Sequence, residues 1–256
     1  MMKQCPKCRY DLQEKCTSCP SCGIVFEKYF KYHPAPTQQQ DIQPPVVKQY
    51  AKTTVKPWRK RLFHEERSSY NCFLGRSVIF IGLIIWSWLL ISSGIDNNTA
   101  GESILHAVNL PFHEAGHLIF RPFGALITSL GGSLGQLLMP GICMGVLLIN
   151  TRDPFGASVA LWWLSENFLD MAPYINDARA GQLLLLGGNY GHSAPYGFHD
   201  WEFILTESGL LYYDHVLAKI AYVLGSAIMI LSLAWGGFLL IRQYRNLTSE
   251  NDTASK

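Results

Sequence analysis

The residues with the clearest chemistry form the run Phe112-His113-Glu114-Ala115-Gly116-His117, which reads H-E-x-x-H. Residues four apart share one face of a helix, so His113 and His117 can direct their imidazoles at one point, where two neutral imidazoles suit zinc. Glu114 lies one step round the helix, close enough to act as a base on a zinc-bound water. Three ionisable groups are costly to bury in so apolar a region, which favours a metal site over a merely decorated helix.

A catalytic zinc ion usually takes three protein ligands and leaves a fourth position for water. The third ligand must come from elsewhere, and two segments qualify. One carries Asp170 and Asp177, which are seven residues apart and could share a helix face. The other contains the pair His199-Asp200, where His199 could bind the metal or Asp200 could bind or orient the site. Helix capping, or pairing with Arg179, is the non-functional alternative for the aspartates.

A second group of metal ligands lies near the N-terminus, where five of the seven cysteines precede residue 23. Two C-x-x-C knuckles, Cys5-Pro6-Lys7-Cys8 and Cys19-Pro20-Ser21-Cys22, supply the four thiolates of a closed structural zinc site. The repeated Cys-Pro-x-Cys resembles the small zinc-ribbon family. Cys16 offers an alternative pairing with Cys19, and redox or disulfide chemistry is the other alternative. Residues 1–15 contain no apolar signal-peptide core, so metal binding on the cytoplasmic side is expected.

The composition changes sharply along the chain. Charged residues make up 16% of the total, against about 25% in soluble proteins. Residues 31–76 are rich in proline and glutamine and then become basic, which predicts an extended linker followed by a cytoplasmic juxtamembrane segment. The basic residues are Lys56, Arg59, Lys60, Arg61, Arg67 and Arg76. The net charge of +2 argues against a dedicated nucleic-acid-binding protein.

Four apolar segments are long enough to cross a bilayer, namely Ser77–Ile95, Leu134–Asn150, Phe155–Ile175 and Val216–Ile241. An even number of crossings places both basic ends of the membrane region on one side, in accord with the positive-inside tendency. The sequence therefore predicts a mostly α-helical, polytopic membrane bundle.

The H-E-x-x-H helix is expected to be short and re-entrant or broken. Asn109 could cap a helix whose first turn holds Pro111 and which ends near Arg121. One kinked span over Ile104–Leu126 is the alternative. The following run Leu130-Gly131-Gly132-Ser133-Leu134-Gly135 lacks the lysine of a phosphate-binding loop, so it predicts close backbone packing of helices or a bend beside the site.

The membrane region resembles the site-2-protease-type intramembrane zinc metalloproteases. His113, Glu114 and His117 match that family's H-E-x-x-H motif fully. The family also has a later helix with N-x-x-P-x-x-x-L-D-G, to which Asp170-Met171-Ala172-Pro173 and Asp177-Ala178 correspond. Here aspartate replaces asparagine, one residue is missing between proline and aspartate, and alanine replaces glycine. The resemblance implies that Asp177 is the third ligand and Glu114 the general base.

These observations predict four parts: a zinc ribbon (1–30), a linker and basic segment (31–76), a membrane domain (77–245) and a polar tail (246–256). We expect two zinc ions, one catalytic in type and one structural, in a protein of the cell's inner (plasma) membrane with its ribbon in the cytoplasm. The expected activity is hydrolysis of peptide bonds in a membrane-protein or peptide substrate, and the ribbon would bind a protein partner. The alternative is a non-catalytic metal-binding or assembly protein that keeps a protease-like scaffold.

Overall fold

The computed structural model describes residues 4–12, 16–33, 62–63 and 69–254. The chain divides into two compact units, an N-terminal unit (Met1–Thr54) and a helical unit (Val55–Lys256). Most of the predicted linker and basic segment lies outside the described residues. Of the six basic residues named above, only Arg76 is described.

The N-terminal unit consists of two similar knuckles followed by helix α1 (Phe26–Tyr32). In each knuckle the first cysteine carbonyl accepts an N–H from the residue four positions later, at 2.9 Å for both Arg9 to Cys5 and Gly23 to Cys19. Arg9 and Gly23 both have positive φ angles, 60° and 72°, so the two turns share one backbone conformation. The apolar side chains packed around the cysteines are Leu12, Ile24, Phe26 and Phe30. With so small a core, the main source of folding energy would be metal ligation by the cysteines.

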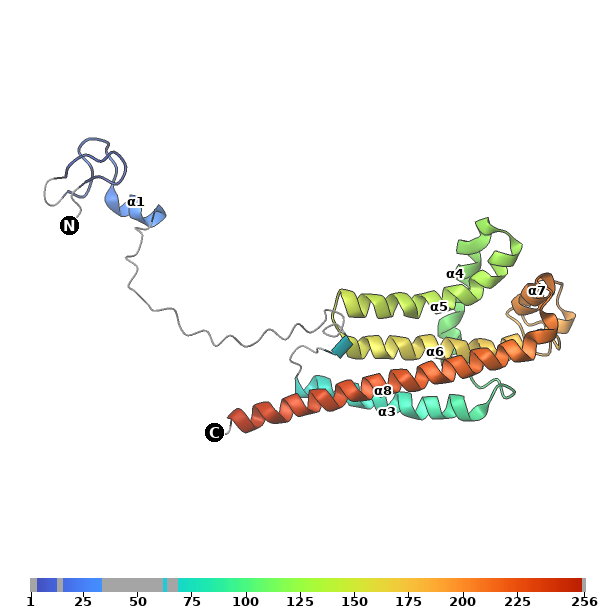
Figure 1. Ribbon diagram of the computed structural model, residues 1–256. Coiled ribbons are helices and arrows are strands. Elements are labelled where there is room, and N and C mark those ends of the chain that lie inside the picture. The colour runs from blue at the N-terminus through green and yellow to red at the C-terminus, as the bar shows by residue number, and fades with distance from the viewer. Residues whose placement is uncertain (1–3, 13–15, 34–61, 64–68, 255–256) are drawn as a thin grey trace. The chain divides into compact units, whose positions relative to one another are not determined.

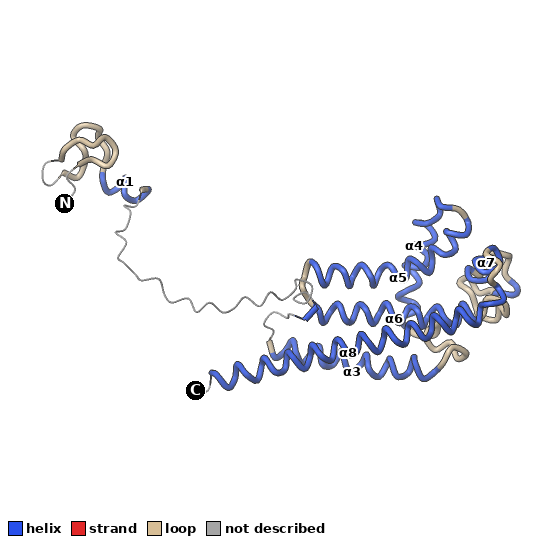
Figure 2. Tube along the Cα trace, viewed as in Figure 1, coloured by secondary structure: helices blue, strands red, loops and turns tan. Residues whose placement is uncertain are grey.

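Four long helices form the helical unit: α3 (Tyr70–Ser93), α5 (Ala125–Ile149), α6 (Pro154–Asn176) and α8 (Asp214–Ala254). They run side by side, and α6 packs against both α5 and α8 (Figure 1). Figure 2 shows helices and loops, and no strand, in the part of the chain that is described. The mostly α-helical fold predicted from the sequence is confirmed.

Polar contacts at one end of the bundle establish the helix directions. Near the start of α3, the Arg76 guanidinium donates to the Asp153 carboxylate at 2.9 Å and to the Gln243 side-chain oxygen at 3.3 Å. Asp153 precedes α6, and Gln243 lies late in α8. Helix α5 ends at Ile149, just before Asp153. Consequently α3 and α6 run in one direction, and α5 and α8 run in the other.

Three helices among the described residues are long and apolar enough to cross a membrane: Tyr70–Ser93, Ala125–Ile149 and Leu211–Ser249. Helix α6, which contains the predicted span Phe155–Ile175, is not among them, so four spans are not confirmed. Buried positions account for 15 of the 23 residues of α6, Glu166 and Asp170 included. Side chains of α4 contact the carboxylates of Glu166 and Asp170, so the sequence of α6 need not be uniformly apolar.

The H-E-x-x-H motif lies on α4 (Ile104–Phe120), a continuous helix of 17 residues that contains Pro111. The predicted start near Asn109 was wrong, and so was the single span to Leu126, because the chain turns through a short 3-10 segment, Arg121–Phe123, into α5. An interior proline removes a backbone hydrogen bond and costs about 3 kcal/mol. In the turns before Pro111, the side chains of His106 and Asn109 contact Asp170 and Glu166 of α6, and these contacts favour the helical conformation there.

Helices α4 and α5 approach each other so closely that their backbones touch. A Cβ added to Gly116 would lie 2.0 Å from the Gly131 carbonyl oxygen, and one added to Gly135 would lie 2.2 Å from the Phe112 carbonyl oxygen. No side chain fits at either position without separating the helices. The close helix packing predicted from the glycine run is therefore confirmed.

We expect Gly116→Ala to lower the stability of the helical unit, because the new methyl group meets backbone that cannot move aside. Overpacking of this kind typically costs about 1–3 kcal/mol. Gly145→Ala is the matched control on α5, since a Cβ there has no atom within 4 Å and alanine favours helix by about 1 kcal/mol. Thermal unfolding in detergent measures both variants, and equal midpoints would contradict the close packing.

Candidate metal centres

The first candidate centre is the H-E-x-x-H group on α4. Ligand atoms of His113, Glu114 and His117 all lie within 4.8 Å of one another. The two imidazoles stand edge to face, with ring centroids 4.8 Å apart. One helix face thus presents two nitrogens and one carboxylate to a common point.

A fourth side chain reaches this point from a distant part of the sequence. Asp200, the first residue of helix α7 (Asp200–Glu207), places Oδ2 3.1 Å from Nε2 of His113 and 3.3 Å from Nε2 of His117. Two ligands on a tetrahedral zinc ion, with bonds of about 2.0–2.2 Å, are separated by about 3.3–3.5 Å. The observed separations are close to that spacing.

The other ring nitrogens of the two histidines are held by oxygen atoms of α5. Nδ1 of His113 lies 2.8 Å from Oε1 of Gln136, and Nδ1 of His117 lies 2.8 Å from the carbonyl oxygen of Thr128. A carbonyl oxygen can only accept, so Nδ1 carries a proton, and Nε2 is the nitrogen through which each ring would bind a metal ion. Metal-binding histidines are oriented in this way in proteins.

Gly132 keeps open the space between the two Nε2 atoms. A Cβ at this position would lie 2.5 Å from Nε2 of His113 and 2.6 Å from Nε2 of His117. A zinc ion bonded to both nitrogens would sit about 2.0–2.1 Å from each. An alanine methyl group would therefore compete for the volume that the ion needs.

Asp200 is itself supported from α6. Its backbone N–H donates to the Tyr174 hydroxyl at 2.9 Å, and the Tyr174 ring stacks on His199 with centroids 4.2 Å apart. Burial by itself raises the pKa of Asp200, but hydrogen bonds to His113 and His117 bring it below its ordinary value. The carboxylate is therefore ionised, as a metal ligand must be.

The other predicted ligands occupy different positions. Asp177 ends α6, and its two carboxylate oxygens accept the backbone N–H groups of Gln182 and Leu183, each at 2.8 Å. His199 is fully buried; its Nδ1 accepts the Glu202 N–H at 3.2 Å and its Nε2 lies 3.7 Å from Asp177. These contacts occupy Asp177 and His199 in building the loop that delivers Asp200.

Asp170 belongs to a separate polar network between α4 and α6. One of its oxygens lies 2.9 Å from Nδ1 of His106, while the Asn109 amide donates to Glu166 at 2.9 Å and accepts from the Trp163 indole at 2.8 Å. Sequence reasoning missed this network, because the helix was expected to begin near Asn109, which left His106 outside it. The available signal was Glu166, a charged residue inside a predicted span.

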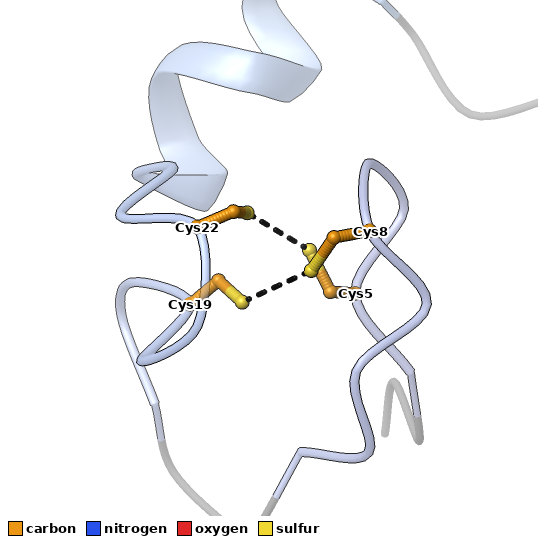
Figure 3. A group of neighbouring side chains, drawn as sticks. All are labelled: Cys5, Cys8, Cys19 and Cys22. Atoms are coloured by element: carbon orange, nitrogen blue, oxygen red, sulfur yellow. Dashed lines mark hydrogen bonds between the residues drawn. The ribbon is translucent and has the colours of Figure 1, made fainter.

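The second candidate centre is the group of four cysteines in the N-terminal unit. Sγ of Cys5 lies 3.7 Å from that of Cys22, and Sγ of Cys8 lies 3.6 Å from that of Cys19 (Figure 3). Thiolates on a tetrahedral zinc ion, with bonds of about 2.3 Å, are about 3.8 Å apart. Cys16 is exposed and is not a member of the group. Two groups that could bind metal ions, as predicted, are therefore present.

Comparison of the chain with protein-family models, with curated proteins and with solved structures finds no match. A function must therefore rest on the chemistry of the two centres and of the helices that hold them.

We expect Gly132→Ala to remove the metal from the α4 centre and to leave the cysteine centre filled. The methyl group would displace the two imidazoles from their shared point. Elemental analysis of purified protein should give two zinc ions per chain for the unmodified protein and one for this variant. Gly141→Ala is the control, since its Cβ meets only ordinary contact, 3.7 Å from a Leu164 methyl. Two zinc ions in Gly132→Ala would rule out this position for the metal.

Proposed function

We propose that the helical unit is a zinc metalloprotease that hydrolyses peptide bonds in or beside the membrane. His113, His117 and Asp200 are its zinc ligands, and Glu114 is its general base. The observation that carries the proposal is the contact of one Asp200 oxygen with both Nε2 atoms, at 3.1 and 3.3 Å. Asp200 replaces Asp177, the ligand that the family resemblance implied.

The chemistry needs a Lewis acid and a base side by side. When bound, zinc polarises the scissile carbonyl and makes a water molecule more acidic. The Glu114 carboxylate takes the proton from that water and later donates it to the leaving amine. Gln136 and the Thr128 carbonyl hold the imidazoles so that their Nε2 atoms are directed at the site.

The site lies at the end of the bundle opposite Arg76. Helix α4 follows the end of α3 that is distant from Arg76, and α7 follows the corresponding end of α6. In our proposal α3, α5, α6 and α8 make four crossings, with the basic end in the cytoplasm. The zinc site then faces the non-cytoplasmic side. A helical substrate must unwind there before cleavage, because its amides are satisfied internally in lipid.

The N-terminal unit has a different role in this proposal. Four thiolates fill a tetrahedral zinc site and leave no position for water. The unit therefore holds a structural ion and binds a protein partner in the cytoplasm. The absence of a third ligand would favour the alternative function, a non-catalytic metal-binding or assembly protein. Asp200 supplies a candidate for that ligand, which favours hydrolysis.

We expect Glu114→Gln to abolish hydrolysis without loss of zinc. Glutamine has nearly the same shape as glutamate but cannot accept the proton, and loss of a general base costs about 10²–10⁴-fold in rate. The assay is cleavage of a quenched-fluorescence library of apolar peptides in detergent micelles, with zinc content measured on the same samples. Cleavage by Glu114→Gln at the rate of the unmodified protein would contradict the proposed mechanism.

Paired asparagine variants distinguish the two candidate ligands. We expect Asp200→Asn to lose the α4-centre zinc on dialysis against a mild chelator, because a neutral amide binds zinc weakly. Asp177→Asn, the matched control, should retain two zinc ions per chain. A His113→Ala/His117→Ala protein defines the one-zinc reference. The opposite pattern, with zinc lost from Asp177→Asn and kept by Asp200→Asn, would restore the ligand implied by the resemblance.

A further inference from the structure

A cavity of about 440 Å³ opens beside the α4 centre. It lies between the 3-10 turn after α4, the first turns of α5 and the segment around Asp200. The residues that line it are Arg121, Gly124, Ala125, Thr128, Ser129, Gly197 and Phe203. Its volume is near the lower end of the range of ligand pockets, about 300–1,000 Å³. A cavity of this size suits the end of a peptide better than a long segment.

Several residues that line the cavity are bonded to, or close in sequence to, members of the metal-ligand group. Thr128 contributes the carbonyl oxygen that lies 2.8 Å from Nδ1 of His117. Arg121 follows His117 by four residues, at the end of the same helix. Gly197 and Phe203 each lie three residues from Asp200. These links place the cavity next to the ligand group.

One charged side chain lines the cavity, that of Arg121, and no carboxylate does. Arg121 is exposed and forms no ion pair within the part of the chain that the structure describes. The remaining walls are mainly apolar or small, with the Phe203 ring as the one large group. A planar guanidinium binds a carboxylate through two parallel hydrogen bonds, which gives both affinity and orientation.

We propose that this cavity is the substrate subsite next to the cleaved bond, and that it selects a carboxylate carried beside an apolar side chain. Arg121 pairs with the carboxylate, and the apolar wall formed by Ala125 and Phe203 accepts the side chain. The carboxylate is either the C-terminus of the peptide or the side chain of an aspartate or glutamate. The inference rests on the proposed function, but the binding it predicts does not require catalysis.

The test measures binding by an inactive protein. Glu114→Gln protein, in micelles of a zwitterionic detergent, is titrated against a fluorescent apolar hexapeptide that ends in phenylalanine with a free carboxylate. The same peptide with an amidated end, and an amidated peptide with a glutamate before the phenylalanine, are the comparisons. Fluorescence anisotropy reports the dissociation constant. Loss of one charge-assisted ion pair corresponds to about a tenfold change or more.

We expect amidation to weaken binding about tenfold, and Arg121→Gln, placed in the same inactive protein, to abolish the difference between acid and amide. Arg245→Gln is the charge-matched control, because Arg245 is exposed late in α8, at the other end of the bundle. Ala125→Phe should fill the cavity, and it should weaken the binding of the peptide that ends in phenylalanine more than the binding of one that ends in glycine. Recovery of binding by the glutamate-containing amide would identify a side chain as the source of the carboxylate.

Equal binding of acid and amide peptides, together with unchanged binding in Arg121→Gln, would overturn the subsite. That result would leave the proposed function standing, since hydrolysis is tested separately through Glu114. Conversely, if the unmodified protein binds no zinc at the α4 centre but still discriminates acid from amide, the subsite is supported and the metalloprotease is rejected.

Discussion

The contact between the backbones of α4 and α5 is the constraint on which the α4 centre depends. Gly116 and Gly131 allow the two helices to touch, and this brings oxygen atoms of α5 within hydrogen-bond distance of both histidines. The same approach places Gly132 against the two Nε2 atoms, where the missing side chain leaves room for an ion. The close helix packing, the orientation of the histidines and the room for a metal ion all depend on one stretch of α5. A substitution there is therefore expected to affect all three.

A second constraint ties α4 to α6. The buried Asn109 amide contacts Glu166 and Trp163, while His106 contacts Asp170. Polar groups in so apolar a unit are costly unless they are paired, so these contacts fix the rotation of α4 about its axis. Helix α6 also supplies the tyrosine that holds the Asp200 backbone. Helix α6 thereby positions both the H-E-x-x-H face of α4 and the loop that carries Asp200.

What could be predicted from the sequence was local. The H-E-x-x-H and C-x-x-C spacings identify both ligand groups, because chain geometry alone brings such residues together. Asp200 is separated from His113 by 87 residues, and no local pattern distinguishes it from Asp177. The structure reveals the difference, since Asp177 is occupied by backbone N–H groups of its own loop. The helix start predicted from Pro111 was wrong for a related reason. The side-chain contacts that favour a helix before Pro111 come from α6, which is distant in the sequence.

In the four-crossing arrangement that we propose, the burial of α6 also bears on how the chain enters a bilayer during synthesis. A helix that carries Glu166 and Asp170 gains little free energy if it moves from water into the bilayer by itself. Its partners on α4 precede it in the chain, and a turn of a few residues joins it to the apolar α5. Helices α5 and α6 are therefore expected to insert as one hairpin, with α4 already in place to receive the polar face. The order of the helices along the chain is thus also a workable order of assembly.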